Sequence, residues 1–99
     1  MIGPLEIQTN WLSKRLLAAH QRAETEVESC LERELLLVVL DGFLVRSTIY
    51  GVALPSPELV HDYSIRMNVL RQRFSAINSI EAQKMVEIID HLLKAKNFH

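Results

Sequence analysis

The chain has 99 residues, of which 48% are hydrophobic and 23% are charged, and its formal net charge at pH 7 is −1. This balance is typical of a globular protein and excludes a largely disordered chain, so we expect one domain over residues 1–99. A net charge so close to zero gives the chain no overall attraction to nucleic acid or to acidic membranes.

The N-terminal half is expected to be helical, because its apolar residues recur at helical spacing. Steps of four and three residues connect Leu12, Leu16, Ala19, Ala23, Val27 and Cys30. Neither Pro nor Gly occurs between Leu5 and Asp41. One continuous helix from Leu5 to about Ile49 is therefore one interpretation, and it would be about 70 Å long at about 1.5 Å per residue.

A second interpretation divides this half into two helices. Thr25 and Glu28 have the spacing of a capping box, in which a side chain at the start of a helix pairs with the backbone three residues on. A helix that starts there would place the break at about Glu24.

The segment from Leu35 to Ile49 has a rival interpretation as a short β-hairpin. Two apolar runs that contain β-branched residues flank Asp41-Gly42, a dipeptide that favours a tight hairpin turn. A lone pair of strands is only marginally stable, and no third strand is evident in the chain. We therefore favour a buried helix, with Gly42 where a neighbouring helix approaches closely.

The C-terminal half predicts an antiparallel helical hairpin from about Pro57 to Lys96, after a loop from Gly51 to Pro55. Ser56 and Pro57 are typical of a helix N-cap and of the first helical residue. The stripe that follows steps by four and three residues and comprises Leu59, Tyr63, Met67, Leu70, Phe74 and Ile77.

The last helix is expected to start at a capping box formed by Asn78 and Glu81. Its wide apolar face comprises Ala82, Met85, Val86, Ile89, Leu92 and Leu93. Together with the preceding segments, this predicts an all-α bundle of three or four helices.

A partner surface is expected near the N-terminus. A helix of about 70 Å is too long for a hairpin with arms of about 30 Å to cover, so its surplus apolar residues would need a second chain. Large side chains outside the main stripes are also typical of interface anchors. The interface predicted on these grounds comprises Trp11, Leu12, Leu16, Tyr50 and Ile88.

An alternative surface is basic and would bind nucleic acid through Arg66, Arg71 and Arg73. Arg66 and Arg73 are seven residues apart, so they share a helix face opposite the apolar stripe and would meet phosphates there. Glu58 and Asp62 dilute the positive field, and no short turn leads into a polar recognition helix. Nucleic-acid binding is therefore less favoured than binding to another protein.

Residues with the spacing of a catalytic or metal site are few. Glu58 and His61 have the Glu-x-x-His spacing of bundle metal sites, but the second motif that such a site needs is missing. Cys30 lies in an amphipathic pattern that favours a buried, inert thiol. We expect neither an enzyme nor a bound metal or cofactor.

A soluble, cytoplasmic protein is expected. Cys30 is the single cysteine, which excludes an intrachain disulfide and favours a reducing compartment. The first residues lack the pattern of a secretory signal. The longest apolar run, Leu35 to Leu40, is far shorter than the roughly 20 residues that span a bilayer.

The function expected from these features is that of a small regulatory or adaptor protein, or a chaperone-like partner, that acts by binding another protein chain. A homodimer is the favoured assembly, and a further protein partner is compatible with it. The alternative is a small transcriptional regulator that binds nucleic acid through its basic helix face.

Overall fold

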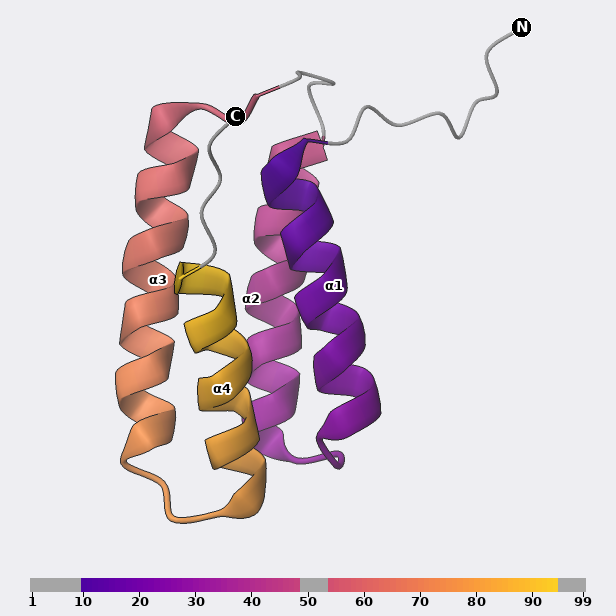
Figure 1. The fold of residues 1–99 in the computed structure, drawn as a ribbon, viewed down its shortest axis with the longest axis vertical. Coiled ribbons are helices and arrows are strands. Elements are labelled where there is room, and N and C mark those ends of the chain that lie inside the picture. The colour runs from indigo at the N-terminus through magenta and orange to yellow at the C-terminus, as the bar shows by residue number, and fades with distance from the viewer. Residues whose placement is uncertain (1–9, 49–53, 95–99) are drawn as a thin grey trace, which may run out of the picture.

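The computed structural model describes residues 10–48 and 54–94, and these residues form an all-α bundle (Figure 1). Its helices are α1 (Trp11–Glu26), α2 (Leu31–Thr48), α3 (Pro57–Ser75) and α4 (Ile80–Lys94). Successive helices run antiparallel, α1 packs mainly on α2, and α3 packs mainly on α4. The predictions of an all-α bundle and of a C-terminal helical hairpin are confirmed.

One face of every helix contributes to a common apolar core, and the buried residues recur every three or four positions. These residues are Leu12, Leu16, Ala19 and Ala23 in α1, Leu36, Leu37, Leu40 and Phe43 in α2, Leu59, Tyr63, Met67, Leu70 and Phe74 in α3, and Ala82, Met85, Ile88, Ile89 and Leu92 in α4. The helix α4 lies in front of α2 in Figure 1, between α3 and α1, and α2 contacts all three other helices.

The helix α1 begins at a capping box formed by Asn10 and Ser13. The Oδ1 atom of Asn10 accepts a hydrogen bond from the Ser13 N–H (2.9 Å), and the Ser13 hydroxyl accepts one from the Asn10 N–H (3.0 Å). The Asn10 amide also donates to the carbonyl oxygen of Ser47, near the end of α2 (2.9 Å). Asn10 and Ser47 are both buried, so this bond fixes one end of α1 against α2.

Residues 27–30 interrupt the N-terminal half, so the continuous helix from Leu5 to Ile49 is wrong. Two helices are present, but the break is not at Glu24. The Thr25 hydroxyl donates to the carbonyl oxygen of Gln21 (2.9 Å) inside α1, so Thr25 does not start a new helix.

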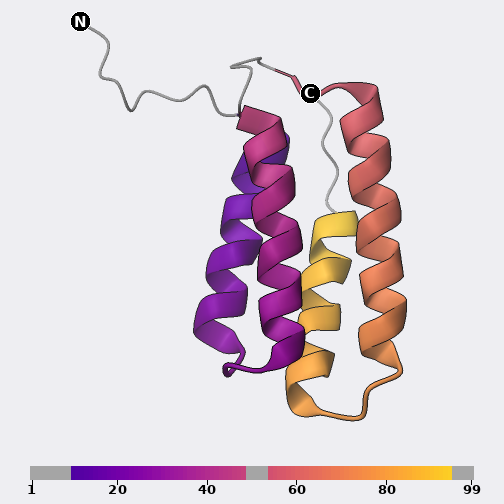
Figure 2. The same cartoon turned by 180° about the vertical axis from the view of Figure 1, so that it is seen from behind.

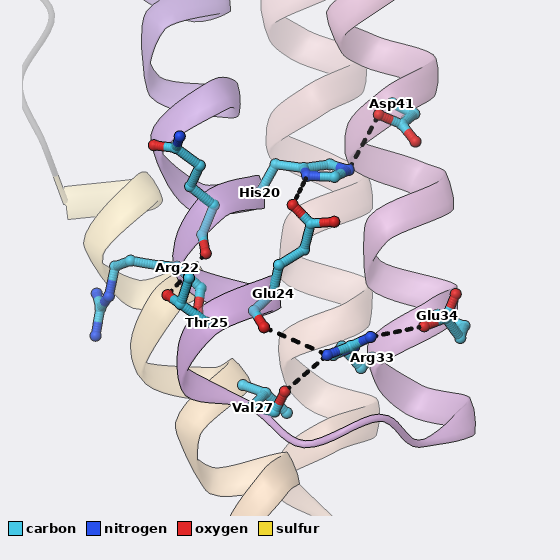
Figure 3. Close-up of polar contacts among 9 residues, drawn as sticks. His20, Arg22, Glu24, Thr25, Val27, Arg33, Glu34 and Asp41 are labelled. Atoms are coloured by element: carbon cyan, nitrogen blue, oxygen red, sulfur yellow. Dashed lines mark hydrogen bonds and ion pairs between the residues drawn. The ribbon is translucent and has the colours of Figure 1, made fainter.

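Cys30 and Arg33 close the turn between α1 and α2, and Figure 3 shows the contacts of Arg33. The Cys30 sulfur accepts a hydrogen bond from the Arg33 N–H (3.4 Å), in the position that serine or threonine usually takes. The Arg33 guanidinium donates to the carbonyl oxygens of Val27 (2.9 Å) and Glu24 (3.4 Å). These contacts satisfy carbonyl groups that the end of α1 leaves without a helical partner.

The helix α2 is continuous from Leu31 to Thr48, so the alternative β-hairpin around Asp41-Gly42 is wrong. The expectation of a helix that approaches closely at Gly42 is also wrong among the described residues, because a Cβ atom built there meets nothing within 4 Å.

The second hairpin starts as predicted and then differs by one residue. The Ser56 hydroxyl accepts a hydrogen bond from the Leu59 N–H (3.1 Å), which confirms the cap of α3. At α4 the cap is Ser79 and not Asn78, because the Ser79 hydroxyl accepts from the Ala82 N–H (3.1 Å). The predicted cap at Asn78 is therefore wrong by one residue; serine and asparagine are both good caps, so their sequence preferences do not separate these neighbours.

Candidate protein-interaction surface

The helix α2 carries a second apolar row on the side that faces away from the core. This row, which we call the α2 stripe, comprises Leu31, Leu35, Val38, Gly42 and Val45. The exposed fractions are 81% for Leu31, 66% for Val38, 56% for Val45 and 39% for Leu35. Successive members are four, three, four and three residues apart, which is heptad spacing.

Packing among residues 10–48 and 54–94 does not account for the α2 stripe. At about 100° per residue, the stripe lies opposite Leu36, Leu40 and Phe43, which fill the core. A helix that is apolar on all sides is normally covered on all sides, but the described residues cover only one side of α2. Isolated exposed apolar residues are common, whereas a row at heptad spacing is the pattern of a seam between helices.

A groove between α2 and α3 runs beside the α2 stripe; Figure 2 shows these two helices side by side. Its wider end has a volume of about 570 Å³ and is lined by Leu31, Glu32, Glu34, Leu35, Val38, Arg73, Phe74 and Ile77. A smaller part, of about 260 Å³, is lined by Val39, Gly42, Phe43, Arg46 and Arg66. The groove is open to solvent, so it suits side chains of a second protein better than an enclosed small molecule.

Two apolar side chains of α3 are also exposed. Ile65 is 50% exposed and Val69 is 45% exposed, and both are close in sequence to Arg66, which lines the groove. Neither side chain lines the groove.

Acidic residues border the α2 stripe on the side of α1. The carboxylate of Asp41 lies 3.2 Å from the His20 side chain of α1. Glu34 pairs with Arg33, whose guanidinium contacts α1 (Figure 3). The side chains of Glu34 and Asp41 remain 56% and 60% exposed. We call these two residues the acidic edge.

Arginines border the stripe on the side of α3. We call Arg46, Arg66 and Arg73 the arginine edge, since all three are exposed and line the groove. Arg46 forms a salt bridge with Asp62 (3.1 Å). Arg66 and Arg73 form no salt bridge with any residue in 10–48 or 54–94.

Most residues of the interface predicted from the sequence lie inside the bundle. Leu12, Leu16 and Ile88 are at most 1% exposed, so these side chains pack against other helices of the same chain. Trp11 is partly buried against the core, with the Arg15 guanidinium 5.2 Å from its ring centre. Tyr50 lies outside the described residues. That prediction assumed a continuous N-terminal helix, which the break at residues 27–30 removes.

The three arginines of the basic-face alternative do not act together. The Arg71 guanidinium forms two hydrogen bonds with the Asp90 carboxylate of α4 and is turned away from the groove. These hydrogen bonds hold the pKa of Asp90 below its usual value. Arg66 and Arg73 share one side of α3, as predicted, but this side faces the groove. It is not opposite the predicted apolar stripe, because Phe74 and Ile77 of that stripe line the groove with Arg73.

Residues considered for chemistry are scattered. Glu58 and His61 are exposed on α3, and the described part of the chain contains no group of three or more His, Cys, Asp or Glu residues that fits a metal ion. Burial raises the pKa of Tyr63 to about 12, but its hydroxyl donates to the carbonyl oxygen of Leu92 (3.3 Å) inside the core. In residues 10–48 and 54–94 we find no helix with the length and apolarity needed to cross a membrane.

A pocket between α1 and α4 is smaller than a typical ligand site. Its volume is about 170 Å³ and it is lined by Arg15, Ala18, Ala19, Arg22, Ile88, His91 and Leu92. Typical small-molecule sites have volumes of roughly 300–1,000 Å³.

Comparisons of the chain with protein-family models, with curated proteins and with solved structures find no match.

Proposed function

We propose that this chain is a protein-interaction module of the regulatory or adaptor class, which binds another protein through the α2 stripe and the adjoining groove. The observation that carries the proposal is the row of exposed apolar residues at heptad spacing on α2. An amphipathic helix binds a partner in this way, by presenting apolar side chains at successive turns.

Burial of the exposed apolar side chains of the α2 stripe would favour association. Complete burial of a leucine or valine side chain contributes about 1.5–3 kcal/mol, so the exposed parts of Leu31, Val38 and Val45 together offer several kcal/mol. Part of this is offset by the loss of translational and rotational freedom on binding. The apolar groove adds area next to the stripe, and the flanking charges give the surface directional specificity.

Nucleic-acid binding is the weaker proposal. Arg66 and Arg73 are exposed and would meet phosphates, but the groove between them and the α2 stripe is largely apolar. A duplex would leave that apolar surface uncovered. Binding of a labelled DNA duplex that weakens steeply with salt, and that Arg66→Ala and Arg73→Ala abolish, would support this reading instead.

Site-specific photocrosslinking, carried out in the cells that make the protein, tests the proposal. A photoreactive amino acid replaces Val38 in the α2 stripe, and in a matched control it replaces Glu87, which is exposed on α4. We expect position 38 to give discrete protein adducts that position 87 does not give. Equal crosslinking at both positions, or none at position 38, would contradict the proposal.

A further inference from the structure

We infer that the occupant of this surface is a second copy of the chain, docked with its α2 parallel to the first around a two-fold axis that runs along the two helices. The inference rests on the proposed function and names the partner. The surface is complementary to its own copy after a two-fold rotation.

The α2 stripe has the pattern of one strand of a two-stranded coiled coil. Its steps of four and three residues keep one seam facing a partner helix along the whole of α2. A two-fold axis brings the same patch of both copies together, so one seam is enough for both sides of the interface. Gly42 lies within this seam and leaves open space above its backbone, which lets a second helix approach there.

The charged edges decide the orientation. Asp41 contacts His20 of α1, and Glu34 pairs with Arg33, whose guanidinium contacts α1. Arg66 and Arg73 lie on the α3 side, where Glu32 also lines the groove. Rotation about an axis parallel to α2 exchanges the two sides and keeps the height along the helix. The acidic edge of each copy then faces the arginine edge of the other. Antiparallel docking would instead place the acidic edges against each other, which is repulsive.

The charged residues of the two edges also lie at matching positions along the axis of α2. Glu34 and Arg73 both line the wide end of the groove, and Gly42, the neighbour of Asp41, lines the same part as Arg66. Parallel docking therefore places Glu34 near Arg73 of the partner subunit and Asp41 near Arg66 of the partner subunit. Neither arginine has a salt-bridge partner among the described residues of its own chain, so both are available for this contact.

The size of the face fits a dimer. The 18 residues of α2 give it a length of about 27 Å, and two helices side by side are about 20 Å across, so the face is roughly 540 Å² in projection. Its accessible area is larger because the side chains make it uneven. A standard interface buries about 800 Å² on each partner, which is of the same order.

A charge-exchange experiment on the full chain tests the partner and the pairing of the edges. One variant carries Glu34→Arg and Asp41→Arg, and the other carries Arg66→Glu and Arg73→Glu. We expect wild type to dimerise and each variant alone to dimerise about 10- to 100-fold more weakly, because like charges now meet at both edges. In an equimolar mixture, the two variants should form a heterodimer about as tightly as wild type dimerises. The control Glu87→Arg, on α4, should dimerise like wild type.

Disulfide trapping tests the orientation. In a Cys30→Ser background, Leu31→Cys and Val45→Cys are oxidised separately and then as a mixture. Parallel docking brings each position close to its own copy, so each variant alone should form covalent dimers. Cross-linking only in the mixture would show antiparallel docking and overturn the inferred arrangement.

The remaining outcomes are equally decisive. Unchanged dimers in both charge variants would overturn the pairing of the edges. A wild-type chain that stays monomeric at every concentration would overturn the second copy as occupant. In that case, adducts from position 38 to a different protein would leave the proposed function standing, and their absence would remove both.

Discussion

The side-chain amide of Asn10 donates a hydrogen bond of 2.9 Å to the carbonyl oxygen of Ser47, and both residues are buried. The same side chain caps α1 through its Oδ1 atom. One asparagine therefore starts a helix and also fixes that helix to the far end of its neighbour.

Substitutions at Asn10 should separate these two roles. Asn10→Ser keeps a capping oxygen but loses the donor to Ser47, so we expect a loss of about 1 kcal/mol in the free energy of unfolding. Asn10→Ala loses both and should cost about 2 kcal/mol. Urea denaturation followed by circular dichroism measures the difference. Equal costs for both variants would show that the bond to Ser47 contributes nothing.

Gly42→Ala should stabilise the folded monomer. The substitution removes the entropic cost of a glycine inside a helix, which is about 1 kcal/mol, and the new Cβ atom meets nothing within 4 Å. Denaturation at low protein concentration, where α2 is not covered by a partner, measures the effect. A destabilised monomer would mean that another part of the chain packs on Gly42.

Substitutions in the core should destabilise the monomer far more than substitutions in the α2 stripe. Leu40→Ala removes a side chain that is 1% exposed and should cost about 2–5 kcal/mol of stability. Val38→Ser changes a side chain that is 66% exposed and should change monomer stability by at most about 0.5 kcal/mol. Thermal denaturation of dilute samples gives both values. A large cost for Val38→Ser would place it in the monomer's own core.

Tyr63 should make the protein less stable at high pH. Its pKa is about 12 in the folded chain and about 10 in the unfolded chain, so above pH 10 the unfolded chain binds fewer protons. Stability attributable to this group is present below pH 10 and falls by about 1.4 kcal/mol per pH unit up to pH 12. Urea denaturation of wild type and Tyr63→Phe across this range should show this additional loss in wild type alone. If the stability of wild type and of Tyr63→Phe fell equally between pH 10 and pH 12, the raised pKa of Tyr63 would be contradicted.

Much of the second hairpin could be predicted from the sequence, because its signals are local. Ser56 and Pro57 mark the start of α3, and all but one of the residues in its predicted stripe are buried. The exception is Ile77, which lies beyond the end of α3 and is 36% exposed. The start of a helix and its apolar stripe both depend on residues that are close in sequence, so they could be predicted without knowledge of the tertiary structure.

The break between α1 and α2 could not be placed in this way. Residues 27–30 contain no glycine or proline. The turn is closed by the Cys30 cap and by hydrogen bonds from the Arg33 guanidinium to the carbonyl oxygens of Val27 and Glu24. These contacts depend on how α1 and α2 come together. The incorrect continuous helix then led to an interface at Leu12 and Leu16, which the core occupies.

The α2 stripe was present in the sequence but hidden by a second pattern. Two apolar rows share α2, one that includes Leu36 and Leu40 and one that includes Leu35 and Val38. Their overlap makes the run from Leu35 to Leu40 resemble a helix that is buried on all sides. Only the positions of the other helices show which row is covered.

Sedimentation equilibrium of wild type and Val38→Asp, over a wide range of concentrations, tests the central claim most directly. We predict that the wild-type mass rises with concentration from 11.4 kDa towards twice that value, while the variant stays folded and at 11.4 kDa. Wild type that remains at 11.4 kDa throughout, or a folded Val38→Asp variant that dimerises as wild type does, would contradict the account.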